Sequence, residues 1–222
     1  MLGLFSRRQL DELTEPLPRA QLLQRGRVAV VDDEKPEMLD DLKKMGLSID
    51  HLASVGDQSF VRLEEGFYDL ALLDYGGVGG AFGPDEGLDV LRHLRRVNPG
   101  LRILAFTGRT FDASKADFFR NCNGVVKKDS GIRELLETIE FHLAEVMTPA
   151  HHWNVLRGAL GVSVSARKLR QIEKSVLRAK RRPDGTGAEI KGIVSAAIGS
   201  GASKAIEATV EKLITLAIAA AL

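Results

Sequence analysis

Short apolar runs that stop at polar residues are the first pattern along this chain. Continuous apolar runs of this length are typical of strands that are covered on both faces in a parallel sheet. We therefore interpret them as buried parallel strands. Four runs end in this way: residues 27–31 at Asp32 and Asp33, residues 70–73 at Asp74, residues 101–106 at Thr107, and residues 124–126 at Lys127 and Lys128.

Between the apolar runs, hydrophobic residues recur at the three- and four-residue spacing of amphipathic helices. A further short strand is predicted at residues 49–55. The alternation predicts an α/β fold with (βα)5 order and a doubly wound parallel sheet with helices packed on its faces. The helical patterns lie at residues 38–45, 60–67, 88–94, 113–119 and 132–143.

The polar residues at the strand ends are the candidates for chemistry. In an open parallel sheet the carboxyl ends of the strands share one edge, where ligands bind. Asp32, Asp33, Asp74, Thr107 and a lysine are therefore expected at one edge of the sheet. Taken alone, the first two acids are equally typical of a helix N-cap followed by a first-turn acid.

Four motifs, in this order along the chain, resemble those of the receiver domains of two-component response regulators. The resemblance covers about residues 26–147 and implies a flavodoxin-like receiver fold followed by a helical C-terminal extension. The motifs are Val30-Val31-Asp32-Asp33-Glu34, Leu72-Leu73-Asp74, Phe106-Thr107-Gly108, and Gly124-Val125-Val126-Lys127-Lys128-Asp129.

The resemblance implies a phosphoryl-accepting site of the kind used in bacterial phosphorelays. Asp74 would be the nucleophile toward a phosphohistidine on a histidine kinase or phosphotransfer protein. A carboxylate attacks a phosphoryl group only where a cation and a cationic side chain neutralise both charges, and Mg²⁺ prefers oxygen ligands. In the family pattern, Asp32, Asp33, Asp74 and the Gly76 carbonyl hold Mg²⁺, while Thr107 and Lys128 contact phosphoryl oxygens.

The resemblance leaves the choice of lysine open and bears on whether the protein is an enzyme. Lys127 remains an alternative to Lys128 as the ammonium group that contacts the phosphoryl group. The protein is expected not to be an enzyme toward other molecules, beyond its own phosphorylation and dephosphorylation.

The segment after Asp74 departs from the family pattern. Residues 76–83 contain five glycines, and Gly87 follows Asp74 by 13 positions, several more than is usual in receivers. The order of the glycines fits neither the dinucleotide-binding nor the P-loop pattern. We interpret the segment as a flexible surface insertion, with a phosphate cradle or a kinase-specific contact as alternatives. Val125 also departs, because many receivers have an aromatic residue there.

Charge is divided unevenly along the 222 residues. Residues 150–222 contain 12 Lys and Arg against 5 Asp and Glu, whereas residues 1–149 contain 19 against 25. A basic back half favours contact with the acidic front half or with anionic partners. The single cysteine, Cys122, excludes an intramolecular disulfide and a cysteine-built metal site. The N-terminus does not resemble a secretory signal, so a cytoplasmic protein is expected, with peripheral association at the inner membrane surface as an alternative.

The chain is predicted to have four segments: an N-terminal arm at residues 1–25, the receiver at 26–147, a basic helical segment at 148–182, and an apolar amphipathic helical tail at 183–222. The basic segment is predicted to contain helices at residues 152–160 and 165–178. A linker is predicted at 181–187, and a break in the tail near 199–201. The arm, which contains Pro16 and Pro18, is expected either to pack on the domain or a second copy, or to be a solvated leader.

Three interpretations of the C-terminal region compete. Residues 159–167 resemble the turn of a DNA-binding helix-turn-helix, but Arg167 and Arg170 occupy positions where apolar residues are needed. Residues 200–222 carry a narrow polar stripe on an apolar helix, which suits docking to a membrane surface, although their uncharged end is about half the length needed to span a bilayer. We favour the third interpretation, in which the helices pack on each other, on the receiver or on a second copy.

The sequence therefore predicts a response regulator whose C-terminal helices control self-association, giving a homo-oligomer, or partner binding. One alternative is a phosphate-independent pseudo-receiver that acts as an adaptor at a membrane or a partner protein. The other alternative is a DNA-binding regulator.

Overall fold

The structure of the chain is a computed structural model, which describes residues 9–55, 58–108, 113–161, 164–179, 191–192, 194–196 and 203–219. These residues form two compact units. One unit comprises residues 18–146, and the other combines the described parts of residues 1–17 and 147–222. We call them the receiver unit and the helical unit. The receiver unit is thus joined to the helical unit at both of its ends.

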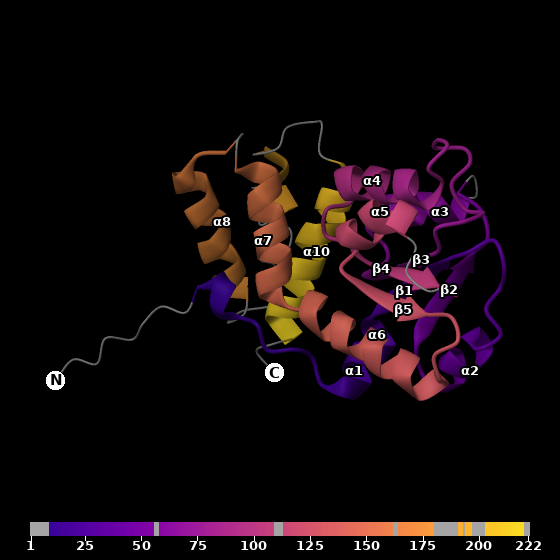
Figure 1. Cartoon of the computed structure of the whole chain (residues 1–222). Coiled ribbons are helices and arrows are strands. Elements are labelled where there is room, and N and C mark those ends of the chain that lie inside the picture. Colours follow the sequence, from indigo (N-terminus) through magenta and orange to yellow (C-terminus); the bar gives the residue numbers. More distant parts are fainter. Residues whose placement is uncertain are drawn as a thin grey trace. The chain divides into compact units, whose positions relative to one another are not determined.

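A five-stranded, all-parallel sheet forms the centre of the receiver unit (Figure 1). The strands are β1 (Arg27–Val31), β2 (Ser48–Leu52), β3 (Leu70–Leu73), β4 (Arg102–Thr107) and β5 (Gly124–Lys127). Their order in the sheet is β2-β1-β3-β4-β5. The predicted doubly wound, flavodoxin-like α/β fold is therefore confirmed. In this order the direction of winding reverses between β1 and β3, and ligands bind at such a point in open α/β sheets.

Helices cover both faces of the sheet (Figure 1). On one face, α6 contacts α1 and α2, and on the other, α4 contacts α3 and α5. Alternate strand residues point to opposite faces, so Ala29, Val31 and Leu73 share a core with Leu91 and Phe118 beneath α3, α4 and α5. The helices are α1 (Arg19–Arg25), α2 (Leu39–Lys44), α3 (Gln58–Glu64), α4 (Gly87–Val97), α5 (Ala116–Asn121) and α6 (Ile132–Val146).

Helix α1 was not among the helices that the hydrophobic pattern predicts. Pro16 and Pro18 argued against a long helix in this segment, and α1 is short and begins directly after Pro18. A proline that precedes the first turn removes no internal hydrogen bond, so the helix is compatible with it. Leu22 and Leu23 are buried, and they anchor α1 in the receiver unit.

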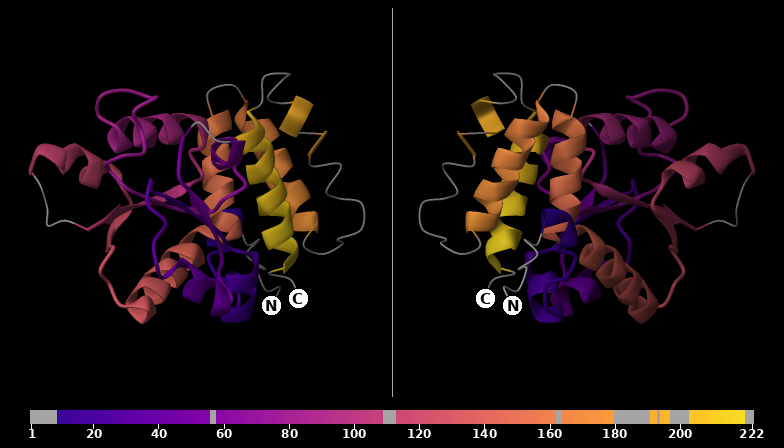
Figure 2. Two further views of the ribbon diagram at one scale, coloured as in Figure 1. Left: turned by 90° about the vertical axis from the view of Figure 1, so that its right-hand side faces the viewer. Right: turned by 90° about the vertical axis from the view of Figure 1, so that its left-hand side faces the viewer.

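The helical unit is assembled from both ends of the chain. Its elements are the 3₁₀ helix η1 (Leu10–Glu12) and the helices α7 (Pro149–Leu160), α8 (Ala166–Ala179) and α10 (Lys204–Ala219). Figure 2 shows α7, α8 and α10 packed together. Leu10 shares one apolar core with Leu156 of α7, Ile172 of α8 and Leu213 of α10.

Polar contacts also bind the N-terminal segment to these helices. The Leu10 N–H donates to Glu173 Oε1 at 3.1 Å, the Ala150 N–H donates to the Leu13 carbonyl at 3.2 Å, and Arg157 pairs with Asp11. The segment therefore belongs to the fold of the helical unit.

The predicted helices at residues 152–160 and 165–178 correspond to α7 and α8, and α10 covers much of the predicted tail helix. The apolar sides of these helices face one another, as the favoured interpretation requires. The predicted linker at 181–187 and the predicted break at 199–201 lie outside the described residues. Within the described part of the chain, no helix has the length and apolar character needed to cross a membrane. The division into four segments remains a prediction.

Candidate functional site

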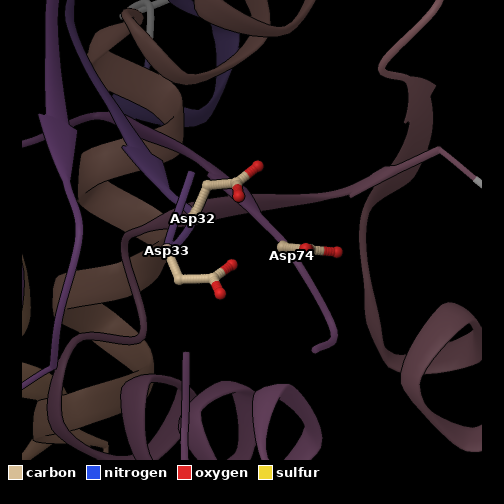
Figure 3. Close-up of side chains that lie close together, drawn as sticks. All are labelled: Asp32, Asp33 and Asp74. Carbon is tan, nitrogen blue, oxygen red and sulfur yellow. The ribbon is translucent and has the colours of Figure 1, made fainter. Parts of the chain in front are cut away.

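Three carboxylates converge where β1 and β3 end. Asp32 and Asp33 directly follow β1, and Asp74 directly follows β3. The two strands are neighbours, with Val31 opposite Leu73. Each of the three carboxyl groups offers an oxygen that lies within 4.8 Å of the others (Figure 3). The strand register alone therefore brings the acids together.

Lys128 extends into the same group of acids. Its backbone N–H donates to the Thr107 carbonyl at 2.9 Å, which continues the pairing of β4 with β5 by one residue. Its Nζ lies 2.6 Å from Asp32 Oδ2 and 2.9 Å from Asp74 Oδ2. Lys127, by contrast, is exposed on β5. Lys128 is thus the lysine that the structure places among the acids.

The charge of Lys128 is well stabilised. Burial by itself lowers the pKa of the ammonium group, but its hydrogen bonds to Asp32 and Asp74 outweigh burial, and the pKa is raised above its ordinary value. Lys128 is therefore protonated at neutral pH and neutralises one carboxylate charge.

Backbone groups orient two of the acids. Asp32 is 1% exposed, and its Oδ1 accepts the Glu34 N–H at 3.1 Å. Asp74 Oδ1 accepts the Tyr75 N–H at 2.7 Å, so that Oδ2 is the oxygen directed at Lys128. In both acids one oxygen is held by the backbone and the other meets the ammonium group.

The remaining candidates lie at the same edge of the sheet. Thr107 is the last residue of β4, in which Ala105 pairs with Leu73 of β3. Gly76 is the second residue after Asp74 and is half-buried. Val125, which takes the place of an aromatic residue of many receivers, is 53% exposed on β5.

The donor set fits a divalent cation. Three carboxylates and one ammonium group within a few ångströms leave two negative charges uncompensated. Like charges at such distances repel strongly where burial reduces solvent screening. A small set of carboxylate oxygens suits Mg²⁺, which binds through oxygen ligands and uses only a few carboxylates.

The glycine-rich loop between β3 and α4 is folded onto the receiver unit. Val78 is buried, and the Phe82 ring centroid lies 5.6 Å from that of Phe60 and 4.6 Å from that of His93. Phe82 reaches the core between α3 and α4. Val78 and Phe82 therefore anchor the predicted surface insertion to the core, while Gly77, Gly80 and Ala81 are exposed. The flexibility of the loop remains a prediction.

The loop also brings Glu86 near the site, a residue that no sequence motif singles out. Gly77, with φ of 76°, lies against Asp33, and a Cβ at this position would be 2.4 Å from Asp33 Oδ2. Glu86 Oε2 accepts the Gly77 N–H at 2.9 Å. No local spacing signals this contact, because it depends on the path of the whole loop.

No family model matches the chain, and no curated protein matches its sequence. Among solved structures, a CheY-like response regulator receiver domain protein from Methanospirillum hungatei JF-1 is 26% identical, with a TM-score of 0.44, and the match covers 55% of this chain and 95% of that one.

Two further structures are similar. A two-component response regulator from Clostridium difficile is 19% identical, with a TM-score of 0.45 over 53% of this chain and 95% of that one. The BeF3-activated DrrB receiver domain is 20% identical, with a TM-score of 0.42 over 53% and 97%. About half of the chain thus resembles receiver domains of response regulators. Because these TM-scores are below 0.5, the fold assignment rests on the strand order and register.

Proposed function

We propose that the chain is a two-component response regulator that accepts a phosphoryl group on Asp74 with the aid of Mg²⁺. The observation that carries the proposal is the position of Lys128 Nζ, within 2.9 Å of both Asp32 and Asp74, beside a third acid at the same strand ends. A lysine between two buried or half-buried acids, with negative charge left over for a cation, is the arrangement that a phosphoryl-accepting carboxylate needs.

Asp74 is the nucleophile in this proposal. Its carboxylate oxygen attacks the phosphorus of a phosphohistidine, a P–O bond forms, and the P–N bond breaks with its electron pair returning to the imidazole. The donor is a histidine kinase or a phosphotransfer protein, which places the protein in the cytoplasm. Catalysis by such a site consists of positioning and charge neutralisation.

The residues around Asp74 have separate roles. Asp32 and Asp33, with Asp74 and the Gly76 carbonyl, hold Mg²⁺, which when bound neutralises charge on the carboxylates and the phosphoryl oxygens. Lys128 exchanges its contact with Asp74 Oδ2 for one with a phosphoryl oxygen. Thr107 donates its hydroxyl hydrogen to another phosphoryl oxygen. The site acts on the protein itself and not on other molecules.

The helical unit is the proposed output. Both ends of the receiver unit continue into it, so a change in the receiver unit is connected to it by two covalent links. Arg167, Lys168 and Arg170 are exposed on α8, and residues 150–222 are net basic. Phosphorylation is proposed to change the self-association of this unit or its binding to a partner.

Beryllofluoride with Mg²⁺ tests the phosphoryl-accepting site. We expect the ¹⁹F NMR spectrum of the wild-type protein to show a bound, Mg²⁺-dependent beryllofluoride signal, because this anion mimics a phosphoryl group on a carboxylate. Asp74→Asn should show none. A wild type without a bound signal, or an Asp74→Asn variant that binds equally well, would favour the phosphate-independent adaptor.

A further inference from the structure

Glu86, at the end of the β3–α4 loop, contacts the peptide group that joins Gly76 to Gly77. Its Oε2 accepts the Gly77 N–H at 2.9 Å. A carboxylate acceptor gives a hydrogen bond that is shorter and stronger than one between neutral groups. Glu86 comes directly before α4, and its carbonyl accepts the Val90 N–H of the first helical turn at 3.1 Å. The carboxylate is therefore attached to a rigid element.

The backbone at Glu86 is held in an unusual conformation. Glu86 has φ of 43° and ψ of −112°, and it is the only residue other than glycine with a positive φ in the described part of the chain. Such conformations are unfavourable and persist where surrounding contacts impose them. Here the next residue, Gly87, donates its N–H to the Tyr75 carbonyl at 2.8 Å, which ties the start of α4 to the segment after Asp74.

The Gly77 N–H belongs to the same peptide group as the Gly76 carbonyl. The described residues contain no cis peptide bond, and in a planar trans peptide the N–H and C=O bonds point in opposite directions. A hydrogen bond that fixes the N–H therefore fixes the direction of the Gly76 oxygen as well. Asp33 also lies against Gly77, so closely that a Cβ at this position would be 2.4 Å from Asp33 Oδ2.

We propose that Glu86 is a positioning residue for the magnesium site, acting through the peptide that joins Gly76 to Gly77. It orients the Gly76 carbonyl, and its negative charge polarises the peptide so that the carbonyl oxygen becomes a better ligand. The inference rests on the proposed function, in which this oxygen binds Mg²⁺. Partners that orient metal ligands typically change metal affinity 10–100-fold when they are removed.

The test compares Mg²⁺ dissociation constants, measured by isothermal titration calorimetry on the full chain without any phosphoryl donor. Glu86→Gly removes the acceptor while allowing the positive φ, and is expected to weaken Mg²⁺ binding about 10-fold or more. Glu86→Gln keeps a side-chain oxygen that can accept the Gly77 N–H. Because a hydrogen bond to a neutral acceptor is roughly half as strong as one to a carboxylate, this variant is expected to weaken Mg²⁺ binding about 3-fold or less.

Asp89→Asn is the matched control. Asp89 Oδ2 accepts the Asp85 N–H at 3.0 Å, so it is a second carboxylate that binds a backbone N–H of the same loop. The peptide that it contacts carries no proposed ligand. Asp89→Asn removes the same charge as Glu86→Gln and should bind Mg²⁺ as the wild type does.

A second measurement follows the contact itself. In ¹H–¹⁵N NMR spectra without metal, the Gly77 amide proton should move upfield in Glu86→Gly and stay closer to its wild-type position in Glu86→Gln. Many displaced amide signals in both variants would indicate a general loss of loop structure and would overturn a specific role for the Glu86 contact.

These measurements distinguish a failure of the Glu86 inference from a failure of the proposed function. If the wild type binds no Mg²⁺ and no beryllofluoride, the proposed function fails and the inference fails with it. If the wild type binds Mg²⁺ and Glu86→Gly binds it equally well, only the role of Glu86 is overturned. If Glu86→Gln binds Mg²⁺ as weakly as Glu86→Gly, the positioning role is also overturned, because a side-chain oxygen that accepts the Gly77 N–H then makes no difference.

Discussion

Gly77 is the residue at which the loop meets the acids, and its lack of a side chain is a steric requirement. Its φ is 76°, and a Cβ would lie 2.4 Å from Asp33 Oδ2. We expect Gly77→Ala to destabilise the protein by about 1–3 kcal/mol in urea denaturation followed by far-UV circular dichroism, and to weaken Mg²⁺ binding. Gly80→Ala is the matched control, because a Cβ at Gly80 meets no atom within 4 Å. Equal effects of the two substitutions would contradict this account.

His152 is a buried, uncharged histidine in α7. It is 3% exposed, and neither ring nitrogen has a hydrogen-bond partner among the described residues. Burial lowers its pKa well below the ordinary value of 6.5, and the nearby charges of Lys212 and His151 lower it further. The folded helical unit therefore holds this ring in its neutral form.

Acid should consequently destabilise the helical unit. Below pH 6.5 the unfolded chain binds a proton at His152 that the folded chain does not bind, so this contribution to stability is complete above pH 6.5 and is lost as the pH falls. The expected loss approaches about 1.4 kcal/mol per pH unit. Trp153, the only tryptophan in the sequence, lies beside His152 in α7 and reports unfolding of this unit by fluorescence.

The variants for this test are His152→Leu and His142→Asn. His152→Leu should flatten the dependence on pH between about 6.5 and 5. His142 also has a lowered pKa, mainly from burial, but it lies in α6 of the receiver unit, so His142→Asn should leave the dependence detected by Trp153 intact. An unchanged slope in His152→Leu would show that another group is responsible.

At the scale of residues, the sequence predicted the location of side chains that lie at the carboxyl end of a strand. Asp33, Asp74 and Lys128 each lie within two positions of the end of an apolar run, and parallel strands bring such positions together whatever the loops do. The choice between Lys127 and Lys128 depended on the orientation of β5, which no spacing revealed. Gly77 and Glu86 were out of reach, because their contact depends on a loop that spans the 13 positions from Asp74 to Gly87.

At the scale of elements, η1 illustrates how a short segment can belong to a core formed by a distant part of the chain. Leu10 is fully buried and Leu13 is 6% exposed, both in the core formed by α7, α8 and α10. Nothing in the pattern of residues 1–25 identifies this partner, because three residues of 3₁₀ helix have no periodicity and the partners lie more than 130 positions away. The sequence could therefore predict only an arm.

Leu10→Ala tests the role of η1. Truncating a fully buried leucine typically costs about 2–5 kcal/mol, and the loss should appear in urea unfolding of the helical unit followed by Trp153 fluorescence. Thr14→Ala, at an exposed position close by, should change the unfolding free energy by less than about 0.5 kcal/mol. A Leu10→Ala variant as stable as Thr14→Ala would mean that η1 does not belong to the unit.

The β3–α4 loop is the element whose packing could not be predicted from its composition. Five glycines among residues 76–83 suggested mobility, whereas Val78 and Phe82 pack on the core. Glycine permits unusual backbone angles, but it does not prevent a neighbouring aromatic side chain from anchoring the loop.

At the scale of the whole molecule, the order of elements was predictable and the grouping of segments was not. The (βα)5 alternation follows from local periodicity, and short right-handed crossovers leave few topologies for it. The union of the two chain ends in one helical unit depends on apolar contacts between distant segments, which periodicity does not encode.

The proposed output makes a prediction at this scale. If phosphorylation of the receiver unit acts on the helical unit, beryllofluoride with Mg²⁺ should change deuterium uptake in peptides from α7, α8 or α10, and should change the sedimentation coefficient if self-association is the output. Asp74→Asn is the control and should show neither change. Changes confined to residues 18–146 would contradict a role for the helical unit.

The most direct test of the central claim is chemical mapping of the phosphorylated side chain. The protein is incubated with acetyl phosphate and Mg²⁺ and reduced with sodium borohydride, which converts an aspartyl phosphate to homoserine, and the peptides are then sequenced by mass spectrometry. We predict homoserine at position 74 in the wild type and none when Mg²⁺ is omitted. Reduction at Asp33 or another acid, or none at all, would contradict the account.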